Sequence, residues 1–595
     1  MEPKKVDTEI TAEALALRQR SISIAEFFEK NRHLLGFDNK RKALLTAVKE
    51  AVDNSVEYNE PVLIRKNRVI QLVKIGELID RIIEENKHSV EGGVDSAEID
   101  GCEVLVYDDK NFKMFFKPAS KVHRHVLRDK LFEIETVGGR KVKVTGSHSV
   151  FALKNSKVRA FPVKELQEGD NIAVPRARLI SGGSLTNLDL TEELQKLSSK
   201  IRHKIMMHGL SFQFDDIPRD WKRFDYMPYS YFEGKKIPEN ALISVRNGRS
   251  KIPVVIEITP ELMRLLGYYA AEGTCYDKWI TFSFGSHEKE LIEDTEKCLI
   301  SVFGNKISFS RIFAHKTAIT VKVYAEVLVI LFKYIFGTGS KAFNKTVPTL
   351  VFNVPTNLQM EFLNAYAAGD GYFGHGKITL ATVSEELSIG IQYLLVLNGI
   401  AYSVRTTELR EREFPSGYKS LCREIHYIYI YGPSSLQTGP LQNNSPLSRI
   451  PLAESGFRNI LRQLNPLISY NNPHYRLYKS YDNFTFESAA KDVIEAQKYG
   501  RSAITLQLQE DIHYFESLLG GDIGFLKIKS IREVKSEKPY VYDFSVPGFE
   551  KFLGGRGPIF LHNSLDACEE ARVLPEVTVS LTELSEERFQ LVVED

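Results

Sequence analysis

The stretch LHNSLDACEEARVLP, residues 561–575, has the pattern of the second half of a helix whose first half is missing. A stretch that would complete it, RKALLTAVKEAVDNS, lies near the other end of the chain at residues 41–55. Its apolar residues recur at three- and four-residue spacing, as they do in an amphipathic helix. Both stretches break at the same dipeptide, Asn54-Ser55 and Asn563-Ser564. The sequence therefore predicts one helix that is divided at a repeated pair of residues.

The composition is that of a multi-domain globular protein. The chain has 595 residues, 43% hydrophobic and 26% charged, so we expect three or more domains. A formal net charge of +1 means that any DNA-binding surface must be local. Five scattered cysteines without a CxxC pair argue against a zinc site or a disulfide framework. Since no apolar run is long enough for a membrane span and no signal peptide is evident, we expect a cytoplasmic protein with no membrane partner.

The character of the sequence changes several times along the chain. Residues 61–79, PVLIRKNRVIQLVKIGELI, begin a β-rich part, and β character returns in residues 524–555. Two β pieces that flank an inserted domain form one fold when their ends lie together. We predict an N-terminal flank (1–54) and a β domain in two pieces (55–180 and 521–563). Between the two pieces lie a connecting region (181–258), a repeat domain (259–432) and a linker or accessory DNA-recognition region (433–520). A C-terminal flank (564–595) follows.

The middle of the chain contains an internal repeat. LLGYYAAEG, residues 265–273, is matched by LNAYAAGDG, residues 363–371, which places Glu272 and Asp370 98 residues apart. The same offset aligns further residues after each copy, so the sequence predicts two copies of an αββ unit. Small residues let two helices approach closely, which would bring the two carboxylates together. Paired acids bind divalent cations that assist phosphodiester cleavage. The alternative is that each copy is a helix end with a glycine cap.

The residues at the two breaks can rearrange the backbone. The Ser55 hydroxyl can attack the carbonyl that precedes it and convert the amide to an ester. At the second break, Ser564 is another hydroxyl nucleophile, and Asn563 can cyclise onto its own carbonyl and cut the chain. His562 can serve as acid or base in that step.

Two further positions could assist this chemistry. TGSHSVF places Thr145 and His148 three residues apart at the end of a predicted β-hairpin, within reach of the first break. Asp543 lies in a predicted strand shortly before the second break and could tune that junction electrostatically. The alternatives are a hydrogen-bonded loop histidine and a solvated carboxylate at a strand end.

These features together resemble an intein with the Hint-type β splicing fold. The resemblance rests on Ser55, VTGSHSVF (144–151), VKELQEGDNIAVP (163–175), VYDFSVPGFEKFLGG (541–555) and the terminal HNS. It implies autocatalytic splicing without a cofactor. Ser55 forms the first ester with help from Thr145 and His148, Ser564 takes over the acyl group, and Asn563 cyclises with help from His562. Many inteins begin with cysteine, so serine here implies oxygen esters and slower chemistry.

The repeat resembles the LAGLIDADG homing endonucleases that many inteins contain. This resemblance implies a pseudo-twofold saddle on double-stranded DNA, with Glu272 and Asp370 holding Mg²⁺. SKAFNKTVP resembles the basic stretch after the first repeat, which makes Lys345 an active-site residue by resemblance, or else an exposed, solvated lysine. The first copy has glutamate where aspartate is commoner, and neither copy spells the motif fully.

Joining the flanks regenerates KEAVDNSLDACEEARVLP, in which Glu50 and Asn54 lie four residues apart on one helix face. This sequence resembles the first ATP-binding motif of the GHKL ATPases, most closely the B subunit of archaeal type IIB DNA topoisomerase (topoisomerase VI). The resemblance implies Glu50 as general base, Asn54 as Mg²⁺ ligand, ATP as cofactor and the topoisomerase A subunit as partner. A solvated helix face is the alternative.

The sequence thus predicts a multi-domain α+β protein. A mostly-β Hint fold carries an inserted pseudo-twofold αββ LAGLIDADG domain, and fragments of a helical GHKL ATPase flank it. The function we favour is self-excision of residues 55–563 by splicing, with an endonuclease in the excised part. One alternative is a topoisomerase subunit with an inert insertion. Another is a LAGLIDADG-type DNA-binding or RNA-maturase protein that does not cleave.

Overall fold

A computed structural model describes most of the chain between residues 55 and 563. The described ranges are 55–176 without 87 and 92–93, 183–431 without 212, 215, 316, 375, 409 and 414–418, then 447, 449–451, 460, 483–485, 505–563, 578–585 and 588–594. The chain divides into two compact units, Met1–Asp53 and Asn54–Asp595. The first unit, and with it the predicted helix that ends at Asn54, lies outside the described residues.

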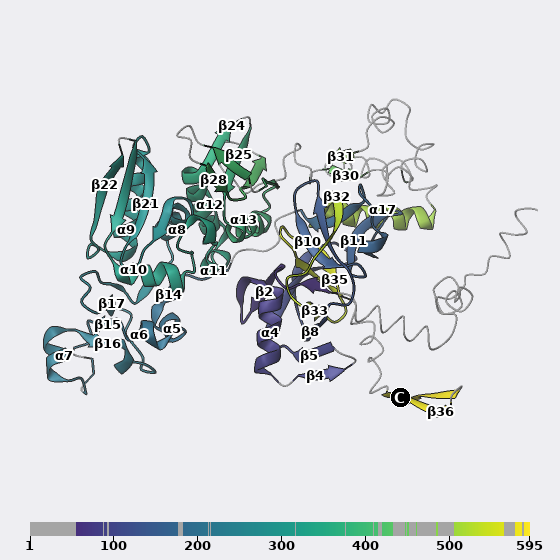
Figure 1. The fold of residues 1–595 in the computed structure, drawn as a ribbon, viewed down its shortest axis with the longest axis horizontal. Helices are drawn as coiled ribbons and strands as arrows, with labels where there is room; N and C mark the ends of the chain where they lie inside the picture. Colours follow the sequence, from purple (N-terminus) through teal and green to yellow (C-terminus); the bar gives the residue numbers. More distant parts are fainter. Residues whose placement is uncertain are drawn as a thin grey trace, which may run out of the picture. The chain divides into compact units, whose positions relative to one another are not determined.

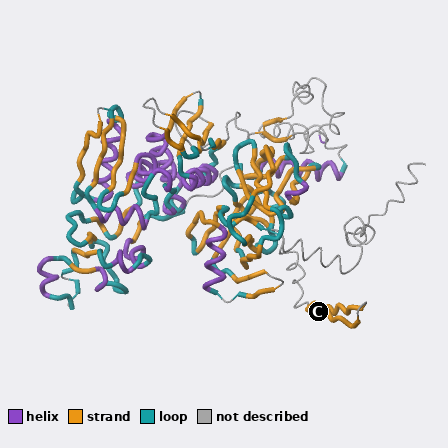
Figure 2. The backbone as a smooth tube through the Cα atoms, in the orientation of Figure 1, coloured by secondary structure: helices purple, strands orange, loops and turns teal. Residues whose placement is uncertain are grey.

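Seventeen strands from the two ends of the second unit form one hydrogen-bonded network, and Figure 2 shows their strand-rich character. They are β1 (Val56–Glu57), β2 (Pro61–Lys66), β3 (Val69–Lys74), β4 (Ser89–Glu91), β5 (Val94–Glu98), β6 (Cys102–Tyr107), β7 (Met114–Pro118), β8 (Lys121–Val126), β9 (Leu131–Thr136), β10 (Lys141–Thr145), β11 (Ser149–Lys154), β12 (Lys157–Pro162), β13 (Asn171–Pro175), β32 (Ile523–Val534), β33 (Tyr540–Ser545), β34 (Lys551–Gly554) and β35 (Ile559–His562). A mostly-β domain built from two separate pieces of sequence is thus confirmed.

Strands from the two sequence pieces alternate within this network, so neither piece can form the fold alone. β13 pairs antiparallel with β32, β8 pairs with β33, and β11 pairs with β35. Figure 1 shows the same arrangement as dark blue strands beside yellow-green ones. The pairing positions the first and last residues of the insertion, because β1 and β35 both belong to it.

One element in this domain differs from the sequence prediction. Residues 61–79 were expected to be β throughout, but the strands end at Lys74 and helix α4 (Ile75–Glu85) follows. The buried residues of α4 recur at three- and four-residue spacing, namely Ile75, Leu78, Ile79, Ile82 and Ile83. The helical spacing of these apolar residues therefore outweighs the strand preference of their β-branched side chains. Within the described residues, no helix is both long enough and apolar enough to cross a lipid bilayer.

The region predicted only as a connection, residues 181–258, contains regular structure of its own. Its elements are β14 (Asn187–Asp189), α5 (Leu190–Gln195), α6 (Ser199–Arg202), β15 (Ile205–His208), α7 (Arg219–Phe224), β16 (Met227–Pro228), β17 (Leu242–Val245), β18 (Ile252–Pro253) and β19 (Val255–Glu257). Strands β16, β15, β17 and β18 form a sheet in that order. The strands have two to four residues each, which is too short for a clear periodic signal in sequence.

The repeat region forms two halves with equivalent elements. The first half contains α8 (Pro260–Glu272), β20 (Gly273–Cys275), β21 (Ile280–Gly285), α9 (Lys289–Phe303), β22 (Phe309–His315) and β23 (Ala318–Val323). The second contains α12 (Thr356–Asp370), β24 (Gly371–Gly374), β25 (Lys377–Thr382), α13 (Glu385–Leu397), β26 (Tyr402–Thr406) and β29 (His426–Tyr431). α10 (Glu326–Ile330) and α11 (Thr349–Phe352) connect the halves.

The two halves repeat in strand register as well as in order. Gly273 pairs with Phe282 in the first half, and Gly371 pairs with Leu380 in the second. Both partners are displaced by the 98 residues that separate Glu272 from Asp370 in sequence. Each half therefore has the predicted αββ order, followed by one more helix and two more strands of its four-stranded sheet.

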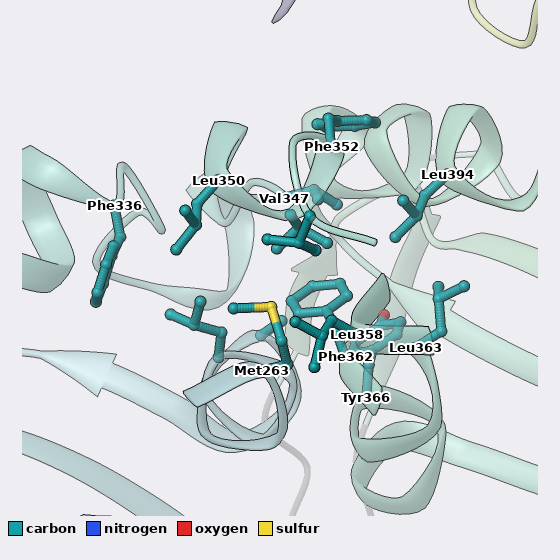
Figure 3. Close-up of a cluster of buried hydrophobic side chains, with 14 of the residues drawn as sticks. Met263, Phe336, Val347, Leu350, Phe352, Leu358, Phe362, Leu363, Tyr366 and Leu394 are labelled. Atoms are coloured by element: carbon teal, nitrogen blue, oxygen red, sulfur yellow. The ribbon is translucent and has the colours of Figure 1, made fainter. Parts of the chain in front are cut away.

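Helices α8 and α12 cross at very short range because of their small residues. A Cβ atom added to Gly267 would lie 2.5 Å from the Phe362 carbonyl oxygen and 2.7 Å from Ala365 Cβ. A Cβ added to Gly369 would lie 2.5 Å from Ala271 Cβ. Figure 3 shows the apolar cluster beside this crossing, with Met263 of α8 near Phe362 of α12.

The remaining described strands and α-helices follow β26 in sequence. They are the hairpin β27 (Arg410–Glu413) and β28 (Lys419–Cys422), the pair β30 (Arg449–Pro451) and β31 (Asn483–Thr485), helix α17 (Leu506–Gly520), and the hairpin β36 (Thr578–Ser585) and β37 (Arg588–Glu594). Most of the predicted linker 433–520 lies outside the described residues.

The close helix crossing generates a stability prediction. Gly267→Val should destabilise the repeat region by about 1–3 kcal/mol, because the added atoms meet backbone that must move. Gly520→Val is the matched control, since nothing lies within 4 Å of a Cβ there, and it should change stability by less than about 0.5 kcal/mol. Urea unfolding of a Ser55→Ala, Asn563→Ala chain, followed by the fluorescence of Trp221 and Trp279, measures both. Equal effects of the two substitutions would contradict the close approach.

Candidate functional site

Ser55 is held where three strands of the two sequence pieces meet. It directly precedes β1, and Val56 of β1 pairs on one side with Val144 of β10 and on the other with Tyr542 of β33. The Ser55 side chain is only 1% exposed. A nucleophile in this position is shielded from water and surrounded by side chains from distant parts of the sequence.

Thr145 holds the backbone of Ser55 on both sides. The Ser55 N–H donates to Thr145 Oγ1 at 3.1 Å, and the Thr145 N–H donates to the Ser55 carbonyl at 3.0 Å. Ser55 N is the amide nitrogen of the bond that the first step would break. The threonine hydroxyl therefore contacts that bond directly, as the sequence motif predicted.

His148 lies in the turn after β10, and its environment differs from that of an ordinary loop histidine. Its backbone N–H donates to the Thr145 carbonyl at 3.1 Å, which fixes the turn. Both ring nitrogens are buried and lack a hydrogen-bond partner within the described part of the chain. Burial, with a smaller contribution from His562, lowers the pKa of His148 to about 3. His148 is therefore neutral near pH 7, and the hydrogen-bonded loop histidine considered from sequence is not what the structure contains.

The second junction is fixed by β34 and β35. Lys551 of β34 pairs with His562 of β35, and the Asn563 N–H donates to the Glu550 carbonyl at 3.0 Å. The Asn563 side-chain amide donates to the Phe544 carbonyl at 2.5 Å, so a neighbouring strand holds its orientation. His562 Nε2 lies 3.4 Å from Glu550 Oε2. The hydrogen bond from His562 lowers the pKa of the Glu550 carboxyl.

Asp543 is buried rather than solvated. It lies in β33, opposite His123 of β8, with 1% of its surface exposed. Its Oδ1 accepts a hydrogen bond at 2.8 Å from the backbone N–H of Phe544, the residue whose carbonyl accepts from Asn563. The carboxylate is thus one residue away from the group that orients the second junction, and its predicted electrostatic role remains a prediction.

Two histidines of β8 that were not predicted from the sequence face the same site. His125 Nε2 lies 2.8 Å from Ser55 Oγ, and His123 bridges the hydroxyls of Ser96 and Ser545 at 2.8 and 2.9 Å. Their spacing in KVHRHV offered a signal, because residues two apart in a strand share one face. This spacing alone does not assign a role to the two histidines, because no local sequence pattern indicates that this face of β8 contacts Ser55.

A second group of polar residues lies where α8 and α12 end. Burial raises the pKa of Glu272 to about 7, and the nearby Asp370 adds to that rise. Burial raises the pKa of Asp370 to about 6, although Lys345 opposes the shift. Lys345 is only 5% exposed, donates to the Ala271 carbonyl at 2.6 Å, and has a pKa that burial lowers to about 8. The solvated lysine considered from sequence is therefore not present.

The paired carboxylates are chemically suited to a divalent cation. Burial raises the pKa of both carboxyls and Asp370 also repels Glu272, so a cation placed between them would be stabilising. Oxygen donors are also those that Mg²⁺ prefers. The described residues contain no group of three or more His, Cys, Asp or Glu side chains arranged to hold a metal ion. Water and substrate oxygens would have to complete the coordination.

Three predicted site residues lie outside the described residues. These are Glu50 and Asn54 before the first junction, and Ser564 after the second. Their assigned roles remain predictions.

Comparison with known proteins agrees with the splicing resemblance. The curated relatives include a transcription initiation factor IIB from Methanocaldococcus jannaschii, 25% identical over 530 residues, which cover 89% of this chain and 53% of the relative. A DNA polymerase from Thermococcus litoralis is 25% identical over 593 residues, covering 86% and 32%. The chain thus spans about half or less of the length of these relatives.

Among solved structures, the transcription factor IIB Mvu mini-intein is 41% identical over 20% of this chain and 71% of its own, with a TM-score of 0.20. The Mja mini-intein of the same factor is 40% identical over 23% and 74%, with a TM-score of 0.18. The family model for the intein splicing domain matches residues 63–563. Because that match covers most of the chain, the chain belongs to the intein splicing domain family, and protein splicing is its function.

Proposed function

We propose that residues 55–563 excise themselves and join residues 1–54 to residues 564–595. The observation that carries this proposal is strand pairing. Val56 follows the first junction and pairs with both Val144 and Tyr542, while Leu561 precedes the second and pairs with Val150. Both junctions are therefore anchored in one network of strands, as a reaction that transfers an acyl group between them requires.

The first step converts the amide between Asn54 and Ser55 to an ester. Ser55 Oγ attacks the Asn54 carbonyl carbon, the C–N bond breaks, and the Ser55 nitrogen becomes a free amine. Thr145 hydrogen-bonds to that nitrogen and holds the amide in place. Neutral His148, whose backbone N–H bonds to the Thr145 carbonyl and whose ring has no hydrogen-bond partner among the described residues, would supply a hydrogen-bonding group to this bond.

The later steps join the flanks and release the insertion. The Ser564 hydroxyl takes the acyl group from Ser55, and the side-chain nitrogen of Asn563 then attacks its own backbone carbonyl and cuts the chain. The orientation of the Asn563 amide by Phe544, and the position of His562 beside Glu550, support these roles. A final shift from oxygen to nitrogen restores an amide between the flanks.

Intact-mass measurement of the expressed and warmed chain tests this proposal. The unmodified sequence should yield two products, residues 55–563 and the ligated flanks. The Asn563→Ala, Ser564→Ala double variant should yield neither. Asn305→Ala, which removes the same kind of side chain from an exposed position, should behave as the unmodified chain. A single unchanged mass for the unmodified chain at every temperature would favour the inert-insertion alternative.

We further propose that residues 259–432 are a LAGLIDADG homing endonuclease that cuts double-stranded DNA. The proposal is supported by the register-matched repeat and by the meeting of Glu272 and Asp370 beside Lys345. The two carboxylates would hold Mg²⁺, which on binding would activate water and stabilise the phosphate charge. Lys345 would place a cation beside the same phosphate.

Isosteric substitution separates cleavage from binding. Glu272→Gln and Asp370→Asn should each lower the cleavage rate about a hundredfold or more, because each removes charge that holds the metal. DNA affinity should stay within about threefold, since phosphate contacts elsewhere supply most of it. Cleavage and gel-shift assays on a duplex that encodes the joined flanks measure both, and Glu290→Gln on the exposed face of α9 is the matched control. DNA binding without cleavage by the unmodified chain would favour the non-cleaving alternative.

We infer that the joined flanks belong to a B subunit of topoisomerase VI. The relatives named above carry the names of a transcription factor and a polymerase, so this inference rests on the restored sequence KEAVDNSLDACEEARVLP alone. In the complete host, Glu50 would be the general base and Asn54 a ligand of the Mg²⁺ that accompanies ATP. ATP hydrolysis should then begin only after splicing and be lost in Glu50→Gln, while the mass of the spliced product stays normal.

A further inference from the structure

We propose that His125 is the base that removes the Ser55 hydroxyl proton in the first step of splicing. The sequence motif points to Thr145 and His148, and the structure adds His125, whose Nε2 lies 2.8 Å from the reacting oxygen of Ser55. The inference rests on the proposed splicing function and assigns a specific catalytic residue to its first step.

The hydrogen bonds of the His125 ring determine which nitrogen faces the serine as an acceptor. Nδ1 lies 3.1 Å from the Val126 carbonyl oxygen, which can only accept a hydrogen bond, so Nδ1 carries the ring hydrogen. Nε2 then presents its lone pair 2.8 Å from Ser55 Oγ, and the serine hydroxyl donates to it. This distance is within the range that direct proton transfer requires.

The backbone of His125 is fixed from two sides. Strand β8 pairs with β5 and with β33, so Val94 and Val541 lie opposite His125 on its two neighbours. The side chain is 4% exposed. A buried ring on an interior strand loses little further freedom during the reaction, which favours it over a loop side chain as the base.

Three side chains have different roles in the first step of splicing. Thr145 contacts the amide nitrogen and His125 contacts the hydroxyl, so the two groups that change bonding have separate partners. The low pKa of His148, caused by burial and by His562, makes it a weak proton acceptor at neutral pH. His148 is therefore better suited to donate a hydrogen bond than to remove the serine proton.

The proton and bond changes balance without another reactant. The Oγ–H proton passes to Nε2 of His125 as Oγ bonds to the Asn54 carbonyl carbon and the carbonyl electrons move to its oxygen. When the carbonyl re-forms, the C–N bond breaks and its electron pair stays on Ser55 N. The proton held by His125 passes to that nitrogen, which belongs to the same residue. The products are an ester, an amine and neutral His125.

The test isolates the first step in the full chain. In an Asn563→Ala, Ser564→Ala background only the ester can form, and hydroxylamine cleaves it to release residues 1–54. Intact mass against time measures the rate. His125→Gln should lower this rate about 10²- to 10⁴-fold, the range expected for loss of a general base. His208→Gln, a buried histidine of β15 outside the splicing site that contacts the Asp225 carbonyl and the Ser244 hydroxyl, should change it less than about threefold.

A change of nucleophile distinguishes a base from a structural side chain. A cysteine thiol ionises near pH 8.5, so Ser55→Cys needs a base far less than serine does. His125→Gln should therefore slow the Ser55→Cys chain less than about tenfold at pH 8.5. A structural role would slow the serine and cysteine chains equally.

Asn563 cyclisation reports whether the variants fold. In a Ser55→Ala background, His125→Gln should leave release of the C-terminal flank within about threefold of its parent. An unchanged ester rate in His125→Gln, or equal losses with serine and cysteine, would overturn the proposal. If the parent background forms no ester at all, the proposed splicing chemistry itself fails, and that outcome is distinct from the other two.

Discussion

The antiparallel pairing of β1 with β10 and β33 is the constraint on which the rest of the site depends. β1 has only two residues, but Val56 is held on both sides, once by the N-terminal piece and once by the C-terminal piece. A slip of one residue would turn Ser55 away from Thr145 and His125, because side chains alternate across a strand. Backbone hydrogen bonds between Val56 and Tyr542, two positions 486 residues apart in sequence, therefore help to position the nucleophile.

Burial determines the chemistry at both polar sites. At the junctions it keeps His148 neutral and places Asp543 and Asn563 away from bulk water, where oriented hydrogen bonds have more effect. At the helix ends it raises the pKa of Glu272 and Asp370 and lowers that of Lys345. Burial therefore favours proton transfer between neutral groups at the junction site, and it favours the binding of a cation at the ends of α8 and α12.

Sequence reasoning succeeded where the pattern was local or repeated. The offset between Glu272 and Asp370 predicted equivalent positions that recur in the strand register of both halves. It failed where a short element had no period of its own, as in the sheet within residues 181–258, and where β-branched residues concealed the helix Ile75–Glu85. His125 was missed for a different reason, since its partner Ser55 is 70 residues away and no local pattern joins them.

The sequence by itself determined that two β pieces and a repeat share one chain, and it predicted which residues near Ser55 and Asn563 react. These features depend on composition, spacing and residue type, which are properties of neighbouring residues. Only the tertiary structure decided that His125 contacts Ser55 and that His148 lacks a ring partner within the described residues. It also showed that Lys345 is buried beside the helix ends. Contacts across distant strands, and the desolvation that shifts pKa values, arise only when the two pieces of sequence pack together.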